Sequence, residues 1–271
     1  MKKKTLSIII LYILISLSGT FTAWSILCPA PMNTNIPKIK SYATDFWWNL
    51  DLKKTPLNIV IEANLTTFYG NLELWQVELY YTSEIYGGQE IRIYGVLLYP
   101  KNKRNLPGIL LIHGYGGNME QMLHYGRFLA INDYAVLLID APGHGKSTSF
   151  PKPTPQNIVN VTENPLGGYL AHAIIASLRG LEVLRNQKFV NKVNLGICGF
   201  SMGGIISFIA GRLDWNVKAI VPIVASGNFP LAIACGGLAN IMIPIESRLS
   251  SKEIINLCKY FDVLPYAREI T

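Results

Sequence analysis

The sequence is poor in charge and lacks the patterns that mark several common classes of protein. Only 15% of its 271 residues are Asp, Glu, Lys or Arg, whereas 50% are hydrophobic. This composition supports a buried core and excludes a disordered or fibrous chain. No internal repeat is visible. Beyond the opening lysines the basic residues are scattered, so nucleic acid is a poor candidate partner despite a formal charge of +7.

The cysteines likewise form no recognisable motif. None of the four belongs to a C-x-x-C pair, so the sequence indicates neither a zinc site nor a thioredoxin-like site, and we expect no metal and no other cofactor. Cys198 lies within an apolar run and is expected to be a small core residue. Cys235 and Cys258 could pair as a disulfide if the domain lies outside the cell.

Residues 1–28 have the pattern of a membrane signal. Lysines at positions 2–4 precede an apolar run of about 22 residues, long enough to cross a bilayer as a helix. The run is longer than most cleavable signals, although cleavage after Ala23 stays open. The lysines predict that the rest of the chain lies outside the cytoplasm, either anchored to the membrane or secreted after cleavage. Residues 29–45 are expected to be a linker.

Residues 46–271 are predicted to form one α/β domain. Segments 75–82 and 89–99 alternate as strands do and flank a Tyr-Gly-Gly turn, which predicts an antiparallel hairpin. Short apolar runs typical of buried strands then alternate with helical patterns. The expected strands are 108–112, 135–139, 193–198 and 217–224, and the expected helices are 119–131, 169–185 and 202–213. This order predicts parallel pairing in a three-layer α/β/α sandwich, with a long loop over 142–168.

Ser201 is the strongest candidate for a catalytic residue. It lies in Gly199-Phe200-Ser201-Met202-Gly203, where an apolar strand pattern ends and a helical pattern begins. The G-x-S-x-G pattern suits a nucleophile elbow, a sharp strand-to-helix turn that exposes the serine while its glycines let strand and helix approach closely. The pattern alone is weak evidence, but its strand–turn–helix context favours a nucleophilic serine.

A second glycine-rich turn supports this hypothesis. The strand 108–112 runs into His113-Gly114-Tyr115-Gly116-Gly117. Such a turn can present a backbone N–H as half of an oxyanion hole, and the residue after the nucleophile presents the other half. The predicted donors are therefore the N–H groups of Met202 and Tyr115. His113 could be a catalytic base, but the setting favours a structural role.

A third motif, Asp140-Ala141-Pro142-Gly143-His144-Gly145-Lys146-Ser147, follows the next predicted strand. Its Gly-Lys-Ser ending is similar to the end of a phosphate-binding P-loop. That loop requires a glycine where this sequence has Asp140, and it requires a helix where prolines follow here. The nucleotide-binding interpretation is therefore rejected.

Taken in order, the three motifs resemble the α/β-hydrolase superfamily, and most closely its acetyl xylan esterase, dienelactone hydrolase and prolyl-oligopeptidase-like branch. The resemblance covers roughly residues 75–271. It implies a serine hydrolase that cleaves ester or peptide bonds through an acyl-serine intermediate, with partners in the order Ser, Asp or Glu, His. The choice between ester and peptide stays open.

No histidine follows Ser201, although this order requires one. The carboxylates at 214, 246, 253 and 262 lie too early or in the region expected to cap the site. We therefore expect that the domain is C-terminally incomplete and derives from a longer gene product. His172, in the middle of a predicted helix, is expected to pack rather than to act as a substitute base. The alternative is a non-catalytic surface or binding protein on a hydrolase scaffold.

Overall fold

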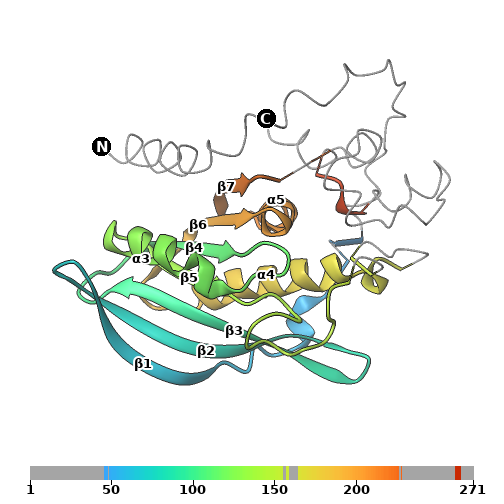
Figure 1. Ribbon diagram of the computed structural model, residues 1–271, viewed down its shortest axis with the longest axis horizontal. Helices are drawn as coiled ribbons and strands as arrows, with labels where there is room; N and C mark the ends of the chain where they lie inside the picture. Colours follow the sequence, from blue (N-terminus) through green and yellow to red (C-terminus); the bar gives the residue numbers. More distant parts are fainter. Residues whose placement is uncertain are drawn as a thin grey trace, which may run out of the picture. The chain divides into compact units, whose positions relative to one another are not determined.

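The computed structural model describes residues 46–47, 49–154, 157–158, 164–225, 227 and 260–263. Within them the domain is built on a mixed sheet with the strand order β1-β2-β3-β5-β4-β6-β7 (Figure 1). The strands are β1 (Val60–Tyr69), β2 (Leu72–Tyr86), β3 (Gln89–Pro100), β4 (Leu106–Ile112), β5 (Ala135–Ile139), β6 (Val190–Phe200) and β7 (Val217–Ile223). The helices are α3 (Leu123–Ile131), α4 (Tyr169–Arg185) and α5 (Met202–Leu213), with the 3₁₀ turns η1 (Leu52–Lys54), η2 (Met119–Met122) and η3 (Pro165–Gly167).

The first three strands form an antiparallel ribbon. The predicted hairpin is confirmed as β2 and β3, which pair from Leu74 opposite Pro100 down to the turn. Gly87 and Gly88 make that turn with φ values of 58° and 77°, which favour glycine. Strand β1 was not predicted from the sequence. This strand lies at the edge of the sheet with most of its side chains exposed on both faces, so it lacks the alternation of a half-buried strand.

The predicted parallel strands are confirmed as β4, β5, β6 and β7. β4 pairs in parallel with β5 on one side and β6 on the other, and β7 continues beyond β6. β5 also pairs antiparallel with β3, which makes the sheet mixed. Because parallel strands end at the same edge of a sheet, the loops that follow β4, β5 and β6 gather there. These loops contain the three predicted motifs.

Helices cover both faces of the sheet, as the three-layer prediction requires. β4 and β5 run in register with Leu110 beside Leu137, so Leu110 and Leu138 point to opposite faces. Gly126 of α3 packs against Leu138, whereas Gly180 of α4 packs against Leu110. Helix α5 packs beside α4. The predicted helix 119–131 begins as the 3₁₀ turn η2 and continues as α3.

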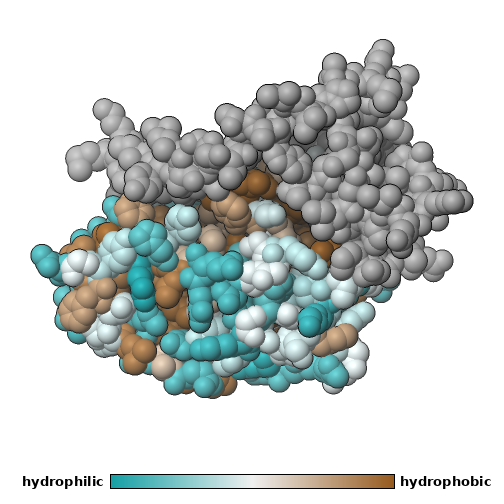
Figure 2. All heavy atoms as spheres, viewed as in Figure 1, coloured by the Kyte–Doolittle hydropathy of each residue, from teal (hydrophilic) through white to brown (hydrophobic). Residues whose placement is uncertain are grey.

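The surface and the N-terminal segment add two observations. In the view of Figure 2, polar residues cover most of the described surface, and apolar ones are scattered among them. No helix within the described residues is long and apolar enough to cross a membrane. The predicted membrane signal, residues 1–28, and the predicted linker, residues 29–45, lie outside the part of the chain that the structure describes.

Candidate active site

Ser201 lies on a sharp turn between β6 and α5. Its φ of 53° and ψ of −113° are strained values for a residue other than glycine. Hydrogen bonds hold the turn: the Ser201 N–H donates to the Ile223 carbonyl at 2.8 Å, and the Ser201 carbonyl accepts the Gly204 N–H at 2.9 Å. The serine is half-buried. The strand–turn–helix context predicted for it is therefore present.

Glycines let neighbouring segments approach this turn closely. A Cβ on Gly199 would overlap the backbone of Gly203, and a Cβ on Gly203 would overlap the Ile112 carbonyl at the end of β4. Gly114 lies beside the serine, since a Cβ placed on it would stand 3.5 Å from the Cβ of Ser201. The loop after β4 and the turn after β6 are thus in contact, as the two motifs predicted.

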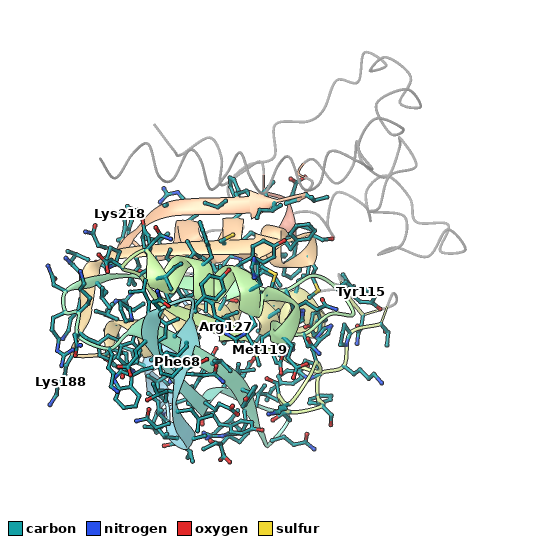
Figure 3. The ribbon with its side chains drawn as sticks, turned by 60° about the vertical axis from the view of Figure 1, so that its left-hand side comes forward. Phe68, Tyr115, Met119, Arg127, Lys188 and Lys218 are labelled. Carbon is teal, nitrogen blue, oxygen red and sulfur yellow. The ribbon has the colours of Figure 1, made fainter. Side chains whose placement is uncertain are left out.

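The two predicted oxyanion donors lie in the segments that meet at Ser201. Met202 is the first residue of α5, and Tyr115 follows Gly114 in the loop after β4. Within the described residues neither backbone N–H donates a hydrogen bond. The Tyr115 side chain is 44% exposed. Figure 3 shows it at the opposite end of the domain from Lys188 and Lys218.

His113 is buried and its ring is fully engaged. The Ala141 N–H donates to His113 Nε2 at 3.0 Å, so this nitrogen carries no proton. The proton therefore resides on Nδ1, which donates to the Gly114 carbonyl at 2.7 Å. Burial lowers the pKa of His113 from its usual 6.5. A neutral ring with both nitrogens occupied is not placed to act as a base, which agrees with the structural role that the sequence favoured.

His144 has the same arrangement in the loop after β5. Its Nε2 accepts the Gly116 N–H at 3.3 Å, and its Nδ1 donates to the Pro142 carbonyl at 3.0 Å. Burial lowers the pKa of His144 as well. Sequence reasoning missed this role. The only signal for it was a histidine beside Pro142 and Gly143 in a loop that follows a buried strand.

Asp140 explains the rest of the third motif. Its buried carboxylate accepts the N–H groups of Met119 at 2.7 Å and Lys146 at 2.8 Å. A Cβ on Gly145 would overlap this carboxylate, which accounts for that glycine. The Ser147 hydroxyl donates to the Asp140 carbonyl at 2.6 Å. The motif thus holds neighbouring loops together. Its backbone N–H groups bind the Asp140 carboxylate, whereas those of a P-loop bind phosphate.

None of the four histidines bonds to Ser201 Oγ within the described residues. His172, in α4, has the Glu84 carboxylate 2.9 Å from Nδ1 and the Leu166 carbonyl 3.0 Å from Nε2. This is the packing role expected for it. His124, on α3, has the Tyr69 hydroxyl 3.4 Å from Nδ1. No histidine is therefore brought to the turn as a base.

Two of the carboxylates that follow Ser201 are described. Asp214 pairs with Arg185, and Asp262 is fully buried. Glu246 and Glu253 lie outside the described residues, as do Cys235 and Cys258 with their candidate disulfide. Among the residues that are placed, no group of three His, Cys, Asp or Glu side chains could hold a metal ion.

A mixed sheet between helical layers, with a serine on a strained turn between strand and helix, defines the α/β-hydrolase class. Two solved acetyl xylan esterases share this fold. One, from a Paenibacillus species, matches with a TM-score of 0.67 at 19% identity, and the match covers 93% of this chain and 81% of that esterase. The other, from a Thermoanaerobacterium species, matches with a TM-score of 0.65 at 19% identity, and the match covers 84% of this chain and 75% of that esterase.

Within that class the chain belongs to the acetyl xylan esterase (AXE1) family, which matches residues 38–241. It is 28% identical over 199 residues to an acetyl esterase of Xylanibacter ruminicola, across 66% of this chain and 43% of that protein. The chain spans under half the length of the curated relatives it matches, 47% and 43%. The predicted resemblance to the acetyl xylan esterase branch is confirmed.

Proposed function

We propose that this chain carries the nucleophile and the oxyanion hole of a serine esterase. The observation that carries the proposal is the turn at Ser201, where a half-buried serine has a strained conformation and the N–H groups of Met202 and Tyr115 donate to no other described residue. Membership in the acetyl xylan esterase family favours an ester over a peptide. The relatives named as acetyl esterases favour a small acyl group.

The chemistry follows from this placement. Ser201 Oγ attacks the carbonyl carbon of the ester, and the carbonyl oxygen becomes an oxyanion that accepts the N–H groups of Met202 and Tyr115. Collapse of this intermediate expels the alcohol, which takes up a proton, and leaves an acyl-serine that water hydrolyses. None of the four histidines is placed to take the hydroxyl proton, so it passes to a base outside the described residues or to solvent.

A fluorophosphonate probe tests the proposal directly, because it reacts only with an activated serine. We expect a single adduct on the peptide that contains Ser201, located by mass spectrometry, and faster labelling when imidazole is added as an external base. Ser201→Ala should abolish the adduct. Ser207→Ala is the matched control, because Ser207 is fully buried in helix α5, which begins directly after Ser201.

A wild-type protein that stays unlabelled with imidazole would refute the esterase proposal. That outcome would favour the alternative, a non-catalytic surface or binding protein, which is motivated by the absence of a histidine after Ser201. The two hypotheses therefore separate in one experiment, without any need to know the natural ester.

We also propose that residues 1–28 hold the domain at a membrane with the catalytic side outside the cytoplasm. The support is the apolar run behind the lysines at positions 2–4. Secretion after cleavage is the alternative. In cell fractions the protein should resist alkaline carbonate extraction, and Ile10→Asp with Ile15→Asp should release it. Recovery of a soluble form that begins after residue 23 would instead establish cleavage.

A further inference from the structure

The loops after β4 and β5 exchange hydrogen bonds through two histidines. His113, from the first loop, accepts the Ala141 N–H of the second, and His144, from the second loop, accepts the Gly116 N–H of the first. The two rings lie edge to face with centroids 4.8 Å apart. We call this reciprocal pair the histidine clasp. Its members lie next to the site but form no part of the chemistry described above.

The clasp fixes both peptide groups that flank Tyr115. The Gly114 carbonyl and the Tyr115 N–H belong to one planar trans peptide group, so they point in opposite directions. That carbonyl accepts two hydrogen bonds, from His113 Nδ1 at 2.7 Å and from the Gly117 N–H at 3.1 Å. The next peptide group is held at its N–H by His144 Nε2 at 3.3 Å. The direction of the Tyr115 N–H is therefore set by these bonds.

We propose that His113 and His144 are positioning residues that aim the Tyr115 N–H at the oxyanion, a role that rests on the proposed function of Ser201. Two bonds to the Gly114 carbonyl also polarise the shared peptide group and strengthen its N–H as a donor. Neither histidine exchanges a proton with substrate. Both act through the backbone.

The clasp requires neutral rings; burial lowers the pKa of both histidines and favours that state, whereas the negative charge of nearby Asp140 opposes it. Each ring must donate through Nδ1 and accept through Nε2, which only the neutral Nδ1–H tautomer does. Around His144 lie the His113 ring, Asp140, and the Tyr169 hydroxyl, which is 3.2 Å from Nδ1 and donates to the Pro142 carbonyl at 2.8 Å. A proton on either Nε2 would face a backbone N–H and open the clasp.

Amide side chains can separate the two bonds of each ring. The asparagine amide nitrogen reaches the position of Nδ1, and the glutamine amide oxygen reaches that of Nε2. His113→Asn keeps the donor to Gly114, whereas His113→Gln keeps only the acceptor for Ala141. At the other histidine the pattern reverses: His144→Gln keeps the acceptor for Gly116, and His144→Asn keeps only the donor to Pro142. Each variant loses one of the two hydrogen bonds of its histidine, so general destabilisation is matched within each pair.

The measurement is the second-order rate constant for fluorophosphonate modification of Ser201. We expect His113→Asn and His144→Gln to react within about threefold of the wild type, and His113→Gln and His144→Asn to react about 10- to 100-fold more slowly. Complete loss of one oxyanion donor costs about 10²–10³, and these variants misdirect the Tyr115 N–H without removing it, so a smaller effect is expected. The control, His124→Gln, changes an exposed histidine on α3 and should react like the wild type. Thermal unfolding verifies that each variant is folded.

The outcomes separate this inference from the function it rests on. No modification of the wild type refutes the esterase proposal itself. Modification of the wild type with equal rate constants in all four variants refutes the clasp and leaves the esterase proposal standing. A crossed pattern is also expected in the amide NMR signal of Tyr115, which should move in His113→Gln and His144→Asn and stay in place in their partners. A Tyr115 signal that moves equally in all four would overturn the positioning role.

Discussion

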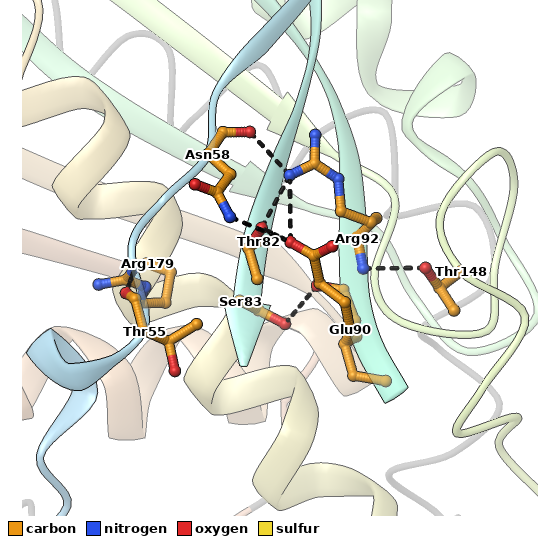
Figure 4. Close-up of polar contacts among 9 residues, drawn as sticks. Thr55, Asn58, Thr82, Ser83, Glu90, Arg92, Thr148 and Arg179 are labelled. Atoms are coloured by element: carbon orange, nitrogen blue, oxygen red, sulfur yellow. Dashed lines mark hydrogen bonds and ion pairs between the residues drawn. The ribbon is translucent and has the colours of Figure 1, made fainter. Parts of the chain in front are cut away.

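Two regions of this domain anchor their loops with different chemistry. In the elbow region, residues 113–117, 140–147 and 199–204, two imidazoles, the Asp140 carboxylate and closely approaching glycines contact the backbone. In the hairpin region, residues 82–92 with the side chains that reach it, polar side chains bind mainly to one another. There Glu84 lies 2.9 Å from His172 Nδ1. Figure 4 shows Glu90, which accepts hydrogen bonds from Thr82 and Asn58 beside Arg92.

The hydrogen-bond partners of the histidines differ between the two regions. Both neighbours of His172, the Glu84 carboxylate and the Leu166 carbonyl, are acceptors. Each ring of the clasp instead meets one donor and one acceptor and stays neutral. The elbow region thus binds its two imidazoles to backbone groups of neighbouring loops, whereas the hairpin region binds His172 to a carboxylate.

The largest difference in the free energy of unfolding is expected between two glycine-to-alanine variants, one in each region. Gly203→Ala places a Cβ on the carbonyls of Ile112 and His113 and should lower the free energy of unfolding by more than about 4 kcal/mol, or prevent folding. Gly88→Ala, at the hairpin turn, meets open space and pays only for its positive φ, about 1–2 kcal/mol. Urea unfolding measures both. Similar losses would mean that the elbow region is not tightly packed.

The elbow region could be predicted from sequence because its signals are local. Gly199 and Gly203 flank Ser201 in one short motif, and each expected strand of the parallel sheet is a continuous apolar run. The contact between Glu84 and His172 in the hairpin region could not be predicted, because the two residues are 88 positions apart. The histidine clasp could not be predicted for a related reason. Each histidine accepts a backbone N–H of another loop, and every residue except proline has such a group, so the sequence does not mark the partner.

The contact between Glu84 and His172 in the hairpin region gives the next largest effect. The two side chains lie 2.9 Å apart and are largely buried, so removal of one leaves a buried polar group without its partner, which costs about 1–3 kcal/mol. Glu84→Ala and His172→Ala should each destabilise by about this amount. The double variant should lose less than the sum of the two, because no unpaired member of the contact remains. Additive losses in a double-mutant cycle would show that the two side chains do not stabilise each other.

Acid should affect the two regions in different pH windows. The pKa values of His113 and His144 are lowered by burial, so below pH 6.5 the unfolded chain binds protons that the folded one rejects. Their contribution to the free energy of unfolding is complete above pH 6.5. It falls as the pH drops below 6.5, by up to about 1.4 kcal/mol per pH unit for each proton. The pKa of Glu90 is lowered from 4.5 by hydrogen bonds from Thr82 and Asn58, so its contribution is lost only below pH 4.5.

Chemical denaturation between pH 4 and 8 measures these windows. In His144→Gln the decline below pH 6.5 should be shallower than in the wild type, because one of the two titrating rings is gone. An Asn58→Ala variant should be less stable than the wild type above pH 4.5 and approach it below that pH, since it removes one bond to the Glu90 carboxylate. A wild-type stability that is flat from pH 7 to 5 would contradict the neutral clasp.

The smallest expected effect contrasts two buried serines. The Ser83 hydroxyl donates to the Ile91 carbonyl at 3.2 Å across the hairpin, so Ser83→Ala should destabilise by about 1 kcal/mol. The Ser207 hydroxyl, on α5 behind the elbow, is fully buried and has no hydrogen-bond partner within the described residues. Ser207→Ala removes a buried polar group that is not satisfied, and should leave the free energy of unfolding unchanged or raise it by about 0.5–1 kcal/mol. A loss at Ser207 as large as that at Ser83 would indicate a bound water behind the nucleophile, and polar anchoring would then extend further into the elbow region than its histidines.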